Sequence, residues 1–303
     1  MVGLDASFVT GSVTVEVPAT SANLGPGFDC LGLALELRDT LVAEVVPDGL
    51  EVRVAGESAD EVTRDEGHLV VRAMRAAFEV MDLRPSGLHL ACTNRIPHSR
   101  GLGSSSAAIV GGIVLARSLV EDGALRLDDA AALSLANRLE GHPDNVAPAL
   151  LGGFVISGRD GDVVWAQQSP VDPSVSAIMF VPPHVVRTEV ARGLLPETVR
   201  HNDAAANSGR VALLVAALSG HPAHLLRATE DFLHQRQREP AMPESLALVD
   251  ALRARGVPAV VSGAGPTVLA FVTDDAEAVA AFAPAGWRTL RQRVGGPGAA
   301  VLM

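Results

Sequence analysis

A glycine- and serine-rich loop that runs directly into an apolar segment is the most constraining feature of this chain. The loop covers residues 97–107, with the letters PHSRGLGSSSA, and the apolar segment Ala108 to Val120 follows at once. Glycines permit backbone turns that a side chain would block, and the serines bring hydroxyls next to the unpaired amides of a first helical turn. A helix dipole adds roughly half a positive charge there. The pattern predicts a phosphate-binding loop at a helix N-terminus.

Two plainer interpretations of this loop fit less well. An ordinary helix cap in a tight turn needs one serine, whereas the chain has three in a row behind two glycines. A dinucleotide-binding fingerprint requires a third glycine that GLGSSS lacks. We therefore favour a site for the phosphates of a nucleotide.

The chain contains no lysine, since all 24 residues counted as Lys or Arg are arginines. A Walker-type phosphate loop, a Schiff-base site and a protein-kinase site each need a lysine, so these three kinds of site are excluded. A nucleotide in this protein must be bound by amides, hydroxyls, a metal ion and arginine.

Composition limits the partners and the compartment. A formal net charge of −11 argues against binding to nucleic acid or to an anionic membrane surface. Aromatic residues are only 3% of the chain, which argues against stacking platforms for single-stranded nucleic acid or sugars. Apolar residues are interspersed with charged ones, so we expect no membrane-spanning segment. Cys30 and Cys92 are too few for a disulfide framework, and the N-terminus lacks a basic cluster before an apolar block. We expect a cytoplasmic protein.

Hydrophobic periodicity predicts an α+β fold in two lobes. Residues 18–35 contain Gly25, Pro26 and Gly27 and are predicted to be too irregular for one element. Residues 167–174 are polar and resemble a domain link, which places the lobes at 1–168 and 169–303. The expected strands cover residues 12–17, 40–46, 50–54, 88–92, 154–157, 163–166, 177–181, 259–261, 268–272 and 288–293, and the expected helices cover 69–81, 108–120, 128–139, 203–218, 222–233, 243–255 and 275–282.

Three stretches of the chain resemble the motifs of the GHMP kinases, a family of ATP-dependent small-molecule kinases. PHSRGLGSSSA is similar to the family's ATP-binding motif, PATSANLGPGFDCLGLAL (residues 18–35) to its N-terminal motif, and SGAGPTVLAF (residues 262–271) to its C-terminal glycine-rich motif. The resemblance implies a two-lobed fold with an N-terminal ATP-binding lobe similar to ribosomal protein S5 and a C-terminal ferredoxin-like αβ sandwich. It also implies ATP and Mg²⁺ as cofactors, an active site between the lobes, and a homodimer.

The same resemblance implies which residues bind ATP and the metal. The expected metal ligands are Ser105 and Glu140. Relatives place a glutamate slightly earlier, on the helix expected over residues 128–139, where this chain has Ser134 and Arg138. The expected ATP-binding residues are those of the whole loop: Pro97, His98, Ser99, Arg100, Gly101, Leu102, Gly103, Ser104, Ser105, Ser106 and Ala107.

The sequence SANLGPGFD (residues 21–29), together with EGHPDNVAPALLGG (residues 140–153), resembles within the family those members that phosphorylate the hydroxyl of L-homoserine for threonine biosynthesis. TEVAR, which ends at Arg192, and HQRQREPAMP, which contains Arg238, resemble segments whose arginines bind the substrate carboxylate. A forked pair of donors suits a carboxylate. The full set of expected substrate-binding residues is Asn23, Asp29, His142, Asn145, Arg192, Arg238, Gly263 and Gly265.

Some family members use an aspartate as the catalytic base, with a lysine as its partner. This chain has Asn145 at the position of that aspartate and contains no lysine. We therefore expect direct in-line attack without a strong general base, with Asn145, Thr188, Ser105 and Glu140 as the catalytic residues. Two alternatives remain open: another small-molecule kinase of the family, acting on mevalonate-type compounds or sugars, and a catalytically silent ligand sensor on the same fold.

Overall fold

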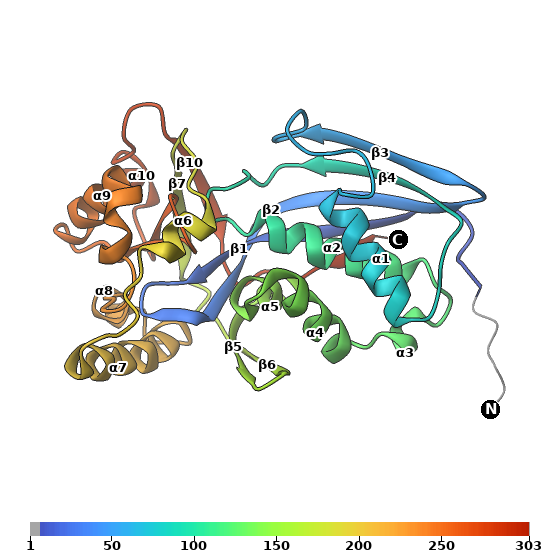
Figure 1. Ribbon diagram of the computed structural model, residues 1–303. Helices are drawn as coiled ribbons and strands as arrows, with labels where there is room; N and C mark the ends of the chain where they lie inside the picture. The colour runs from blue at the N-terminus through green and yellow to red at the C-terminus, as the bar shows by residue number, and fades with distance from the viewer. Residues whose placement is uncertain (1–6, 303) are drawn as a thin grey trace.

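A computed structural model describes residues 7–302, and a seven-stranded sheet is the framework of the larger of its two lobes (Figure 1). Five strands lie in the order β11-β1-β2-β4-β3, and β5 pairs with β2 and with β6. The 20-residue β2 uses Leu31–Leu33 against β5 and Thr40–Val46 against β4. The strands are β1 (Val13–Asn23), β2 (Gly27–Val46), β3 (Gly49–Gly56), β4 (Gly87–Asn94), β5 (Phe154–Asp160), β6 (Val163–Ser169) and β11 (Ala300–Leu302).

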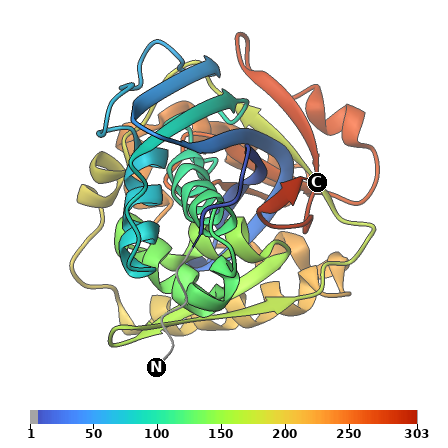
Figure 2. The same ribbon diagram turned by 90° about the vertical axis from the view of Figure 1, so that its right-hand side faces the viewer.

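Helices cover one face of this sheet, and α2 is the central one (Figure 2). Nearly every residue from Ser106 to Ala116 is buried, as expected of a helix that is apolar all round. Asp128 caps α4 through a 2.8 Å hydrogen bond from the Ala131 amide, which confirms the predicted start of that helix. The helices are α1 (Leu69–Val80), α2 (Ser104–Ser118), α3 (Gly123–Arg126), α4 (Asp129–Glu140) and α5 (Pro143–Leu151).

A second, four-stranded antiparallel sheet in the order β10-β7-β9-β8 forms the other lobe. Its core lies between the sheet and α9 and α10, so the predicted α+β class is confirmed. The elements are β7 (Ser176–Val181), α6 (Thr188–Gly193), α7 (His201–Leu218), a 3₁₀ turn (Pro222–His224), α8 (Leu225–Ala228), a second 3₁₀ segment (Arg236–Ala241), α9 (Pro243–Arg253), β8 (Ala259–Val261), β9 (Val268–Val272), α10 (Ala276–Ala280) and β10 (Arg288–Arg293).

The last strand leaves the second lobe and returns to the first sheet, where Val301 lies opposite Val15. The predicted division between residues 168 and 169 falls at the end of β6, and it stays a prediction. No helix within residues 7–302 is both long and apolar enough to cross a membrane.

One predicted element is wrong, and one stretch is more regular than its sequence suggests. Residues 18–35 are not one element, as predicted, because residues 24–26 separate β1 from β2. The rest of this stretch is regular strand, but register shifts after Pro18 and after Ala22, with burial on both faces, hide the period of two. The helix predicted for residues 222–233 ends at Ala228. Beyond it, the Asp231 carboxylate accepts hydrogen bonds from the amides of residues 233, 234 and 235, which holds the backbone in a turn.

Candidate active site

The predicted phosphate loop enters α2 through a backbone that only glycine fits. Gly101 and Gly103 have φ of 72° and 68°. A Cβ on Gly101 would lie 2.2 Å from the carbonyl oxygen of Ser262, and one on Gly103 would lie 2.0 Å from Oγ1 of Thr20. The N-cap residue of α2 is Gly103, which offers no side-chain acceptor, and the first turn holds no acidic residue. The amides of this turn can therefore bind an anion.

The guanidinium of Arg100, a residue of the loop, is hydrogen-bonded to backbone carbonyl oxygens. Its Nε donates to the carbonyl oxygen of Pro182 at 3.0 Å, and its two terminal nitrogens donate to the carbonyl oxygens of Pro183 and His98 at 2.7 and 2.8 Å. Arg100 thus ties the loop to the end of β7. All three of its guanidinium nitrogens therefore already have backbone acceptors, and its predicted role in binding ATP stays a prediction.

A cavity of about 290 Å³ lies beside the loop and between the two lobes. It brings together nine of the predicted site residues: Asn23, Ser105, Glu140, His142, Asn145, Thr188, Arg192, Arg238 and Gly263. Four loop members (Ser99, Gly101, Gly103 and Ser104) line it too, whereas Asp29 and Gly265 do not. Prediction from the sequence did not assign Asp144, Arg187, Glu189 or Ala264, which complete the lining; their only signal is position within or beside the motifs.

Glu140 meets the serines of the loop. Oε1 of this carboxylate accepts hydrogen bonds from the hydroxyls of Ser105 at 2.6 Å and Ser106 at 2.7 Å. Glu140 is the last residue of α4, and Gly141, with φ of 97°, turns the chain into the next helix. Within residues 7–302, no three His, Cys, Asp or Glu side chains gather as a metal cluster. One carboxylate and hydroxyl oxygens are a donor set that suits Mg²⁺, which keeps several waters.

The HPDN motif places three polar side chains at the cavity. Thr20 donates a 2.7 Å hydrogen bond to Oδ1 of Asn145, which leaves Nδ2 as the atom that can donate to a ligand. Nδ1 of His142 lies 2.8 Å from the buried Asp144 carboxylate. Burial opposes the charge of His142, but the hydrogen bond to Asp144 and the charges of Asp144 and Glu140 together raise its pKa. Positive charge at His142 would suit an anionic ligand.

The two predicted arginines have different partners. Arg192 makes a bidentate ion pair with Asp29, at 2.6 and 3.1 Å. Arg238 is only 2% exposed, and it donates to Gly263 O at 3.2 Å and to Nδ1 of His234 at 3.0 Å. No carboxylate within residues 7–302 comes within ion-pairing distance of Arg238. Burial, reinforced by the charge of Arg192, lowers the pKa of Arg238 to about 10.

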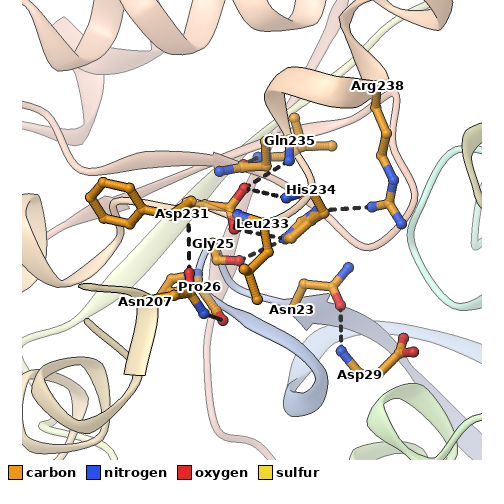
Figure 3. Close-up of polar contacts among 12 residues, drawn as sticks. Asn23, Gly25, Pro26, Asp29, Asn207, Asp231, Leu233, His234, Gln235 and Arg238 are labelled. Atoms are coloured by element: carbon orange, nitrogen blue, oxygen red, sulfur yellow. Dashed lines mark hydrogen bonds and ion pairs between the residues drawn. The ribbon is translucent and has the colours of Figure 1, made fainter. Parts of the chain in front are cut away.

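Figure 3 shows the surroundings of Arg238, with Asn23 across the site below it. Oδ1 of Asn23 accepts from the Asp29 amide at 3.0 Å, and its Nδ2 donates to Gly263 O at 2.9 Å. Both guanidinium groups lie 5.5 Å from the ring centre of Phe28. The N-terminal motif and the glycine-rich motif are thereby joined at one wall of the cavity.

A second cavity of about 330 Å³ adjoins the first and shares Ser99, Ser104 and Ser105 with it. Val17, Leu41, Leu69 and Val70 contribute apolar side chains, and His68, Asn94, His98 and Asp39 contribute polar ones. The Asp39 carboxylate accepts hydrogen bonds from the amides of residues 95 and 96, at 2.6 and 2.9 Å, but burial raises its pKa to about 6. The phosphate loop therefore lies between a polar, charged cavity and a more apolar one.

Comparison with known proteins is consistent with this arrangement. Residues 68–153 match the model of the GHMP kinases N-terminal domain, and residues 213–289 match that of the GHMP kinases C-terminal domain. Proteins named homoserine kinase from Streptomyces avermitilis and Streptomyces coelicolor are each 54% identical over 98% of this chain, covering 97% and 96% of their own lengths. The crystal structure of a homoserine kinase from Cytophaga hutchinsonii superposes with a TM-score of 0.83 at 25% identity, over 98% of this chain and 99% of that one. The chain belongs to the GHMP kinase family.

Proposed function

We propose that this protein transfers the γ-phosphate of ATP to the hydroxyl of L-homoserine, giving O-phospho-L-homoserine and ADP. The observation that carries this proposal is the buried guanidinium of Arg238, which faces the cavity without an ion-pairing carboxylate among the described residues. A buried cation without a counter-ion is costly, so the site favours a ligand that brings an anionic group. The relatives named homoserine kinase support an amino acid as that ligand.

A zwitterionic amino acid matches the charges around this cavity. Arg238 and Arg192 would bind the carboxylate, because a guanidinium donates two hydrogen bonds in the plane of its acceptor. Asp29 and Asn23, with His142 and Asn145 closing the cavity, would contact the ammonium and hydroxyl ends. Each of these residues lines the cavity except Asp29, which reaches it through Arg192.

ATP would span the two cavities. The first-turn amides of α2 and the loop hydroxyls would hold the phosphates, and the more apolar second cavity would hold the nucleoside. Ser105 and Glu140 would hold Mg²⁺, since their oxygens already lie 2.6 Å apart. When bound there, the ion would neutralise phosphate oxygens.

Positioning accounts for the phosphoryl transfer without a strong general base. Asn145 and Thr188, the first residue of α6, both line the cavity beside the phosphate loop. They would donate to the transferring group together with the loop amides, while the homoserine hydroxyl attacks in line. A loose transition state for phosphoryl transfer requires little proton removal before the P–O bond to ADP breaks.

ADP release, measured separately with homoserine, mevalonate, galactose and threonine, tests the proposal. We expect rapid release with homoserine alone. Preference for mevalonate or galactose would indicate another kinase of the family, and nucleotide binding without turnover of any acceptor would indicate a ligand sensor. We further propose that the protein acts in the cytoplasm, where ATP and Mg²⁺ are available, and that it forms a homodimer, as the family resemblance implies.

A further inference from the structure

His234 is a fully buried histidine whose two ring nitrogens both make hydrogen bonds across the site (Figure 3). Nε2 lies 2.7 Å from the carbonyl oxygen of Gly25, in the loop between β1 and β2. Nδ1 lies 3.0 Å from the terminal nitrogen NH1 of Arg238. One imidazole therefore connects the N-terminal motif with the arginine that we assign to the substrate carboxylate.

The two partners fix the chemical form of the ring. A carbonyl oxygen such as that of Gly25 can only accept, so Nε2 must carry the proton. A guanidinium such as that of Arg238 can only donate, so Nδ1 must present its lone pair. His234 is therefore neutral and in the Nε2–H tautomer. Burial, with the charge of Arg238, lowers its pKa and favours this form, while Asp231 and Asp29 oppose the shift.

The ring is held rigidly on both sides. The Asp231 carboxylate accepts from the amides of Leu233, His234 and Gln235 at 2.7 to 3.0 Å, which fixes the backbone that carries the ring. Phe28 packs against the imidazole with ring centres 5.1 Å apart. The β1–β2 loop has a second hydrogen bond beside the one from His234 to Gly25: Nδ2 of Asn207 donates to the carbonyl oxygen of Pro26, the next residue, at 2.8 Å.

Arg238 depends on this ring for its direction. Its other hydrogen bonds within residues 7–302 reach the carbonyl oxygens of Gly263 at 3.2 Å and Ala191 at 3.4 Å, so the bond to His234 is the shortest. The hydrogen bonds to His234, Gly263 and Ala191 occupy NH1 and Nε, which leaves NH2 as the guanidinium nitrogen without a hydrogen-bond partner within residues 7–302. The same ring holds Gly25, two residues after Asn23.

We infer that His234 is a positioning residue, which directs Arg238 toward the substrate carboxylate and couples that orientation to the β1–β2 loop. The inference rests on the proposed function, because it takes Arg238 as the carboxylate-binding residue. His234 does not contact the substrate, since it does not line the cavity. Its removal should weaken homoserine binding more than it slows turnover of the saturated enzyme.

Two substitutions separate the two hydrogen bonds. In His234→Gln, the amide nitrogen takes the place of Nε2 and can still donate to Gly25, but the acceptor for Arg238 is lost. In His234→Asn, the side-chain oxygen takes the place of Nδ1 and can still accept from Arg238, but the bond to Gly25 is lost. Exposed His224, on the same segment and without a side-chain hydrogen bond in the described part of the chain, provides the control His224→Gln.

Steady-state kinetics with both substrates test the inference. We expect His234→Gln to raise the KM for homoserine about ten-fold while the KM for ATP and kcat change less than three-fold or so, and His234→Asn and His224→Gln to stay closer to wild type. An unchanged homoserine KM in His234→Gln, or equal losses in both His234 variants, overturns the inference. Arg238→Ala separates the two proposals: if it also leaves the homoserine KM unchanged, the carboxylate assignment itself fails.

A measurement on the wild-type protein decides the matter if the variants do not fold. Nitrogen-15 NMR of labelled histidines distinguishes the two neutral tautomers from the charged ring. We expect one histidine to remain in the Nε2–H form at neutral pH. A protonated Nδ1 on His234, in either the other tautomer or the imidazolium, could not accept from Arg238 and would refute the positioning role.

Discussion

The hydroxyl of Ser105 donates a hydrogen bond of 2.6 Å to the carboxylate of Glu140, 35 residues away in the sequence. Ser106 donates to the same oxygen. The end of α4 and the start of α2 thus meet at the phosphate loop, with hydroxyl and carboxylate oxygens in contact. This contact places the predicted metal ligands side by side at the edge of the cavity.

Replacing Ser105 with alanine or Glu140 with glutamine should remove most turnover, because the oxygens proposed to hold Mg²⁺ would be lost or weakened. We expect unfolding temperatures near that of the wild type, because both residues are partly exposed. A magnesium titration of the initial rate, with circular dichroism melts, checks both effects. Ser134→Ala, on α4 like Glu140, is the control. Wild-type rates in Ser105→Ala would reject its metal role.

Replacing Arg238 with alanine should raise the KM for homoserine by roughly 10- to 150-fold, because a charge-assisted hydrogen bond contributes about 1.5–3 kcal/mol. The KM for ATP should change little. Arg236→Ala serves as the matched control. Arg236 lies two residues before Arg238, is exposed, and forms an ion pair with Asp250. Equal effects on the two substrates would argue for a general loss of structure instead of a lost carboxylate contact.

Replacing Gly103 with alanine should abolish nucleotide binding. A Cβ there would lie 2.0 Å from Oγ1 of Thr20, so Thr20 would be pushed from its bond to Asn145 while the loop is forced from φ of 68°. Isothermal titration with an ATP analogue provides the measurement. Gly209→Ala is the control, since that exposed position in α7 has free space; it should bind normally and gain about 0.5–1 kcal/mol of stability. Normal affinity in Gly103→Ala would contradict the close packing.

Replacing Asp39 with asparagine should stabilise the protein at neutral pH. The folded pKa of about 6 lies above the ordinary value of 3.8, so the folded state binds more protons between these values and loses stability as the pH rises through them. Asparagine cannot ionise, yet its Oδ1 can accept the same two amides. We expect a gain of up to about 3 kcal/mol near pH 7.5 and little or none near pH 4.

Urea unfolding of Asp39→Asn at both pH values measures this difference. Asp162→Asn, in the exposed turn between β5 and β6, is the control for the substitution itself. A gain that is the same at both pH values would mean that the Asp39 carboxyl does not titrate as its burial implies.

Local features could be predicted from the sequence, because neighbouring residues determine them. The phosphate loop depends on consecutive glycines and serines, and the start of α4 depends on the Asp128 side chain and an amide three residues later. Resemblance supplied Arg192 and Asp29 as separate site residues. Their ion pair joins positions 163 apart, so it follows from the folded topology and not from either local pattern.

The parts that could not be predicted depend on such distant contacts. His234 is hydrogen-bonded to the carbonyl oxygen of Gly25, 209 residues earlier in the sequence. No spacing in the chain indicates that contact. Arg187 and Glu189 line the cavity because α6 lies beside it. Arg187 lies just before the TEVAR segment and Glu189 lies within it, but the resemblance assigned a role to neither. The part of β1 beyond residue 17 was not predicted, because this part is buried on both faces and its sequence lacks the alternation of apolar and polar residues that marks a strand.

The pairing of Val301 with Val15 makes the second lobe an insertion within the first sheet rather than an appendage. Because the chain enters this lobe after β6 and leaves it before β11, two covalent connections join it to the rest of the protein. Cutting the chain at any single linker therefore cannot release two complete halves. A fragment that stopped at residue 168 would expose the backbone edge of β1, where the missing β11 would otherwise provide hydrogen bonds, and would be prone to self-association through that edge.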